Sequence, residues 1–96
     1  SPSDYQRAVV ALMDAVANKL TEESATAALS WLDKLLSGNS DMATRVRYLI
    51  MAGDCYQVLE NNEKAKSCYN EAYMLSFQTG DINLQVRLRE KMDLLS

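Results

Sequence analysis

Histidine is absent from this chain of 96 residues, and proline, glycine and cysteine are scarce, with one, three and two copies. Histidine is the commonest general base and the commonest metal ligand in proteins, so its absence argues against catalysis and against a metal site. Cys55 and Cys68 have no partners at zinc-ligand spacing, and the glycines are too far apart to form a phosphate-binding loop. We therefore expect a protein that is not an enzyme and has no cofactor and no metal.

Long apolar runs and an excess of basic residues are missing as well. No run approaches the roughly 20 residues that span a bilayer, so we expect no membrane partner. The chain has 10 basic and 13 acidic side chains, giving a net charge of −3. A nucleic-acid partner is disfavoured, because phosphate binding depends on a cationic surface.

The first residues and the two cysteines provide expectations about the parent protein and its cellular compartment. It begins at Ser1 without an initiator methionine, which suggests a segment of a longer protein, with a processed natural terminus as the alternative. The sequence shows no signal-peptide pattern, so we expect a soluble protein of the cytoplasm, with the nucleus as the alternative. Cys55 and Cys68 lie in apolar stripes and are interpreted as buried reduced thiols; a disulfide would require an oxidising compartment.

Apolar residues recur at steps of three and four throughout the chain, which predicts helices, and no sustained alternation indicates strands. Thr21 is suited to cap the start of one helix, and Gly38 and Gly80 are suited to the left-handed residue that ends one. The breaks divide a single domain into a hairpin over 4–36, a hairpin over 41–78, and a capping or partial-repeat helix over 82–95.

The second hairpin has small residues where its two helices should meet. Gly53 stands in the middle of a helical stretch, where glycine costs about 1 kcal/mol relative to alanine. Such a cost usually has a packing reason, here the close approach of the next helix through Ala65, Tyr69 and Ala72. An ordinary helical hairpin with alanines at a tight contact would show the same residues.

These residues resemble a tetratricopeptide repeat over residues 46–79. The repeat pattern is Trp-x2-Leu-Gly-x2-Tyr, followed by Ala-x3-Phe and then Pro. This chain has Gly53 and Tyr56 in the first element and Ala65 and Tyr69 in the second. It departs from the pattern in three places, which are Leu49 for Trp, Ala52 for Leu and Phe77 for Pro.

The resemblance implies an all-α fold in which antiparallel hairpins stack as an array of about five helices. It also implies a non-enzymatic scaffold that binds a peptide or helix of a partner protein, in a groove lined by the first helix of each hairpin. Carried onto this sequence, the groove residues are Arg47, Ile50, Asp54, Gln57, Val58 and, from the last helix, Arg87. Arg47 and Arg87 are the favoured pair on one face.

Two alternatives stay open, and one kind of partner is not expected. The two arginines could be solubilising surface charges. Asp54 would repel a terminal carboxylate, so binding of a chaperone's C-terminal tail is not expected. A homo-oligomerisation or assembly element, with the apolar ends of the array pairing, is the alternative to groove binding.

Overall fold

All regular structure in the described part of the chain is helical. The computed structural model describes residues 20–38 and 41–95, and within them it contains four helices and no strand. The helices are α2 (Glu22–Ser37), α3 (Met42–Val58), α4 (Asn62–Thr79) and α5 (Ile82–Leu94). The all-α prediction is confirmed for these residues. Five helices were expected and four are described; the first helix of the hairpin over 4–36 was predicted on residues outside the described ranges.

Each helix begins at a side chain that accepts a hydrogen bond from a backbone N–H of its own first turn. This arrangement satisfies a donor that has no partner inside the helix. The capping residues are Thr21, Asp41, Asn61 and Asp81, which accept from Ser24, Thr44, Lys64 and Leu84. The predicted cap at Thr21 is confirmed, and it forms a full capping box with Ser24.

The helix ends differ from one another. Gly80 ends α4 in the left-handed conformation, with φ 72°, as predicted. Gly38 does not: its backbone is extended, with φ −86° and ψ 172°, so that prediction was wrong. The left-handed residue after α3 is Glu60, with φ 59°, and the N–H groups of Glu60 and Asn61 bond to the carbonyls of Gln57 and Tyr56. Glycine is the usual residue at such a position.

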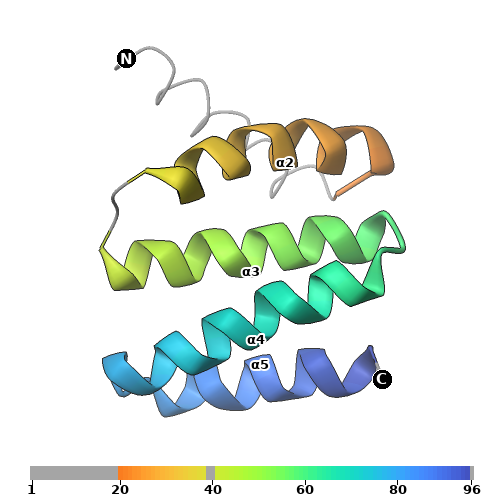
Figure 1. Ribbon diagram of the computed structural model, residues 1–96. Coiled ribbons are helices and arrows are strands. Elements are labelled where there is room, and N and C mark those ends of the chain that lie inside the picture. The colour runs from red at the N-terminus through yellow and green to blue at the C-terminus, as the bar shows by residue number, and fades with distance from the viewer. Residues whose placement is uncertain (1–19, 39–40, 96) are drawn as a thin grey trace.

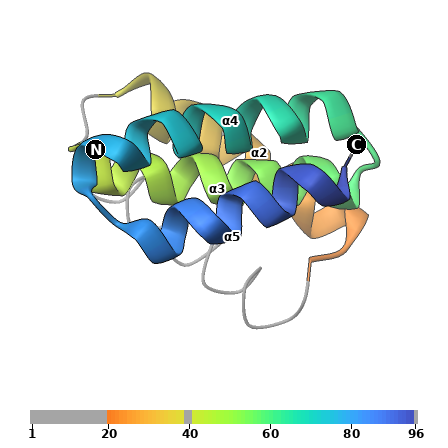
Figure 2. The ribbon, with the colours of Figure 1, turned by 90° about the horizontal axis from the view of Figure 1, so that it is seen from below.

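The four helices lie side by side in chain order, and each runs antiparallel to the one before it (Figure 1). The largest contact joins α3 and α4, while α2 packs on α3 and α5 packs on α4. Seen from below, α5 lies along the pair formed by α3 and α4 (Figure 2). Helices α3 and α5 therefore run in the same direction and begin at the same end of the molecule.

Small residues at the contact of α3 and α4 let the two helices approach closely. Gly53, Ala65, Tyr69 and Ala72 are all buried, as the sequence predicted. A Cβ atom at Gly53 would lie 2.4 Å from Cε1 of Tyr69, so the tyrosine ring occupies the space of the missing side chain. Leu88 of α5 joins this cluster and is fully buried.

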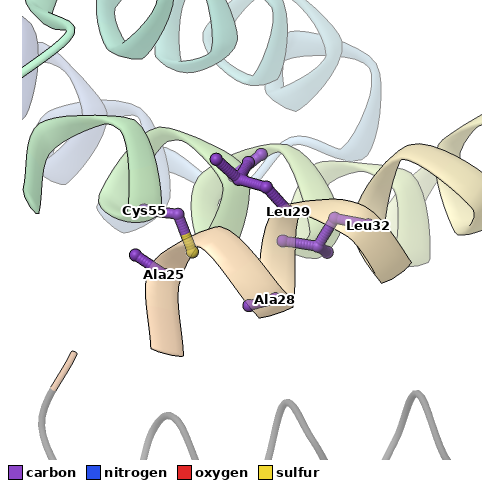
Figure 3. Packing of buried hydrophobic residues seen from close by; sticks show 6 residues of the cluster. Ala25, Ala28, Leu29, Leu32 and Cys55 are labelled. Carbon is purple, nitrogen blue, oxygen red and sulfur yellow. The ribbon is translucent and has the colours of Figure 1, made fainter. Parts of the chain in front are cut away.

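A second cluster holds α2 against α3. Figure 3 shows Ala25, Leu29 and Leu32 of α2 packed beside Cys55 of α3. Cys55 is buried and Cys68 is half-buried, and both are free thiols. Burial raises the pKa of Cys55 to about 11, and the Asp54 carboxylate acts in the same direction. The Cys55 thiol is thus a protonated packing group at neutral pH.

Candidate partner-binding site

A pocket of about 420 Å³ opens where α3 and α5 begin. We call it the α3–α5 pocket. Its volume falls in the range of about 300 to 1,000 Å³ that is usual for ligand sites. The residues that line it are Ala43, Val46, Arg47 and Ile50 of α3, Thr79 at the end of α4, Asp81, which caps α5, and Leu84 and Arg87 of α5.

The pocket brings together three residues that the sequence predicted for the groove. Arg47 and Arg87 come from different helices and are exposed, and Ile50 is half-buried. They meet because α3 and α5 start at the same end of the molecule and Leu88 packs α5 onto the cluster of α3 and α4. The prediction that Arg47 and Arg87 bind a partner is not tested by this geometry, but the two side chains do line one cavity.

The inner wall of the pocket is apolar. Val46 is buried, and Ile50 and Leu84 are half-buried and pack on the same core cluster as Leu88. Val46 and Leu84 are not among the groove residues that the sequence predicted. The predicted pairing of Arg47 with Arg87 placed α3 and α5 on one face, but no local pattern shows that Val46 and Leu84 also line a pocket there, because that depends on how the two helices pack.

Two cap carboxylates lie close to the arginines. Asp81 lines the pocket, and its Oδ1 accepts the N–H of Leu84 at 3.0 Å. Asp41 accepts the N–H of Thr44 at 2.8 Å and its hydroxyl at 2.9 Å. These hydrogen bonds from Thr44 hold the pKa of Asp41 below its ordinary value, and the charge of Arg47 acts in the same direction. Both carboxylates are therefore engaged at the starts of their own helices.

Asp54 and Gln57 lie further along α3 and are engaged within the chain. The single proton of the Tyr69 hydroxyl is shared between Oδ1 of Asp54 and, at 3.2 Å, Oε1 of Gln57. Lys91 of α5 forms an ion pair with Asp54 at 3.1 Å, and its ammonium lies 5.4 Å from the centre of the Tyr69 ring. Burial and the bond to Asp54 raise the pKa of Tyr69 well above its ordinary value.

This network differs from what the sequence suggested. Asp54 was expected in a partner-binding groove, and the structure pairs it instead with Lys91, a half-buried residue of α5. Val58 is half-buried and packs against the cluster that joins α2 and α3. The structure thus places Asp54, Gln57 and Val58 outside the α3–α5 pocket, and their predicted contact with a partner stays a prediction.

The described part of the chain shows neither a cluster of metal ligands nor a membrane-spanning helix. Residues 20–38 and 41–95 contain no group of three or more cysteine, aspartate or glutamate side chains arranged to hold a metal ion. In the same ranges no helix has the length and apolar character needed to cross a membrane.

Protein-family models, curated proteins and solved structures give no match to this chain. The likeness to tetratricopeptide repeats therefore depends on the residues between 46 and 79 themselves. The stacking of an array remains part of the proposal below.

Proposed function

We propose that this chain is a non-enzymatic protein-interaction module that binds a peptide or helix of a partner protein across α3 and α5. The observation that supports the proposal best is the α3–α5 pocket, which joins Arg47, Ile50 and Arg87 over an apolar wall. Helical modules commonly bind an extended peptide or an amphipathic helix by seating apolar anchors in such a recess.

The proposal also covers how the helices stack and in which compartment the protein acts. We propose that α3 and α4 form one hairpin of a tetratricopeptide-like array and that α5 begins the next unit or covers the end. Their antiparallel order and the close contact through Gly53 and Ala65 support this view. The protein would act as a scaffold in the cytoplasm or the nucleus.

Filling the pocket should abolish peptide binding. We would select binders to the immobilised protein from a random dodecapeptide library on phage, and measure the binding of fluorescein-labelled selected peptides by anisotropy. Ala43→Phe places a ring at the pocket, since Ala43 is exposed and lines it. We expect it to weaken binding by more than about tenfold, or roughly 1.4 kcal/mol.

Ala27→Phe is the matched control, because Ala27 is an exposed alanine of α2 that does not line the pocket. It should leave the affinity unchanged, and both variants should keep the helical circular-dichroism spectrum of the parent. The proposal is wrong if no binder is selected, or if the selected peptides bind the Ala43→Phe variant as tightly as the parent protein.

A second candidate function is self-assembly. Ile82 and Val86 lie one turn apart on α5 and are 71% and 51% exposed. Apolar side chains on one exposed face of a terminal helix favour association with another surface. In this alternative the outer face of α5 pairs with a second copy of the chain, and the α3–α5 pocket has no partner.

A further inference from the structure

We propose that the α3–α5 pocket selects an acidic segment of its partner, in which an apolar side chain enters the pocket and an adjacent Asp or Glu pairs with Arg47 and Arg87. This inference depends on the proposed function, because it names the chemistry of the peptide that the pocket would bind. It goes beyond that function by predicting the sign of the partner's charge and the order of its residues.

The apolar part of the inference depends on the inner wall. Val46 is 2% exposed, and it lies with Ile50 and Leu84 at the same cavity. These three side chains offer no hydrogen-bonding group. A polar side chain placed against this wall would lose water without gaining a hydrogen bond from it, whereas an apolar one would gain contact area.

The charged part depends on which cations of the protein are already paired. Arg45 is bound to Glu71 at 3.0 Å and Lys91 to Asp54 at 3.1 Å. Arg47 and Arg87 have no ion pair or hydrogen bond with any residue in 20–38 or 41–95. Two guanidinium groups at the pocket therefore keep their donors available, and a carboxylate is a group that matches their planar geometry.

The acidic residues around the pocket do not cancel this preference. The carboxylates of Asp41 and Asp81 accept N–H groups at the starts of α3 and α5. Each faces the positive end of its helix, which is equivalent to roughly half an elementary charge. Asp54, the nearest acidic residue further along α3, is neutralised by Lys91. Among the described residues that line the pocket, the positive groups without an ion pair are Arg47 and Arg87.

An acidic peptide fits better than a nucleic acid. The protein carries a net charge of −3, and a long polyanion would extend beyond the pocket and meet that negative surface. Nucleic-acid binding relies on many phosphate contacts along a cationic face. One or two carboxylates beside an apolar anchor need only the pocket itself.

The sequences of the selected dodecapeptides test the inference. We expect an enrichment of Asp or Glu within a few positions of an apolar residue. For a labelled peptide of that group, the double variant Arg47→Gln with Arg87→Gln should weaken binding by roughly three- to thirtyfold, as two partly exposed ion pairs would. Arg89→Gln is the matched control, since Arg89 is an arginine of α5 that does not line the pocket. It should leave the affinity unchanged.

Salt provides a second readout. Raising sodium chloride from about 50 mM to about 500 mM should weaken the parent protein's binding and have less effect on the double variant, because salt screens exposed charges.

The outcomes separate this inference from the proposed function. Some selected peptides could lose binding to the Ala43→Phe variant and yet contain no acidic residue, or bind the double variant as tightly as the parent. That result would overturn the acidic preference but not the proposed function. Failure to select any pocket-dependent peptide would overturn both. Binding of a single-stranded oligonucleotide that the double variant abolishes, with no acidic peptide selected, would also count against the inference. A homodimer that Ala43→Phe disrupts would also count against the inference, because the α3–α5 pocket would then be occupied by a second copy of the chain.

Discussion

A methyl group at position 53 would lie 2.4 Å from Cε1 and 2.7 Å from Cδ1 of Tyr69, well inside van der Waals contact. The ring has little freedom to move away. Tyr69 is fully buried, and its hydroxyl is held by Asp54 and Gln57. Gly53 is therefore the residue that sets how closely α3 and α4 can approach.

Gly53→Ala should destabilise the protein, although alanine is the better helix former. The substitution gains about 1 kcal/mol of helix propensity, while overpacking a well-filled core costs typically about 1 to 3 kcal/mol. The Tyr69 ring is buried and its hydroxyl is hydrogen-bonded to Asp54 and Gln57, so the ring cannot easily move away. We therefore expect the cost of overpacking to exceed the gain in helix propensity. The free energy of unfolding, measured in urea by circular dichroism, should fall by about 1 kcal/mol and by at most about 2 kcal/mol.

Gly38→Ala serves as the control for this prediction. A Cβ at Gly38 would come no closer than 3.6 Å to another atom, and the backbone there is extended, which any residue can adopt. Its effect should stay within about 0.5 kcal/mol. Equal stability of the parent and the Gly53→Ala variant would contradict the tight contact of α3 and α4.

At the scale of elements, both apolar packing and polar contacts attach α5 to the rest of the protein. Leu88 is fully buried in the cluster of α3 and α4, and burial of such a side chain contributes about 1.5 to 3 kcal/mol. Near the end of α5, Lys91 connects the helix to Asp54 and lies over the Tyr69 ring. The start of α5 has no comparable polar link to α3, and the α3–α5 pocket lies there.

Lys91→Met should loosen the second half of α5 more than the rest of the protein. It keeps most of the side-chain volume but removes the ion pair with Asp54, whose two side chains are 38% and 34% exposed. For a pair so accessible to solvent we expect a loss of about 0.5 to 1 kcal/mol. Amide hydrogen exchange should show faster exchange in α5 than in α3 or α4.

Lys64→Met is the control, since Lys64 also lies near an aromatic ring, that of Tyr56, but belongs to α4. It should not change exchange in α5. A uniform change across all helices in the Lys91→Met variant would show that the ion pair does not hold α5 in particular.

At the scale of the whole molecule, exposed apolar side chains are unevenly distributed over the described surface. The large apolar side chains that are exposed in the described ranges are Met42, Met74, Phe77, Ile82, Val86 and Leu94. Several of them lie near the junction of α4 and α5, where the Tyr73 and Phe77 rings meet edge to face at 5.0 Å between centroids. This distribution is what keeps self-assembly as a second candidate.

Light scattering over a range of protein concentrations distinguishes the two functions. If the protein binds a separate partner, the mass should be that of a monomer throughout. The alternative predicts a dimer that Val86→Lys abolishes and that Ser30→Lys, on the exposed side of α2, leaves intact. That result would show that the functional surface is the outer face of α5 and not the α3–α5 pocket.

Much of the fold could be predicted from local patterns. The stripes of apolar residues, with Thr21 as a cap and Gly80 as a helix end, placed the bounds of the 41–78 hairpin and of α5 to within about two residues, because those signals act within one turn of a helix. The prediction failed at Gly38, where the chain leaves α2 extended. Glu60 was not predicted to be left-handed, yet it adopts that backbone conformation, which glutamate does not favour.

The candidate site could be predicted only in part. Arg47, Ile50 and Arg87 were proposed from the sequence and do line one pocket. The ion pair of Asp54 with Lys91 was missed, because the two residues are 37 positions apart and each helix offers several exposed positions that could have met.

The sequence by itself determined the helices, their apolar faces and the small residues at the contact of α3 and α4, since each follows from interactions between near neighbours in the chain. The tertiary structure alone decided which polar residues are used internally and which remain available. Packing of Leu88 fixes the position of α5, and that position brings Lys91 to Asp54 while leaving Arg47 and Arg87 at an open pocket. Such pairings depend on distances between helices, which no local pattern specifies.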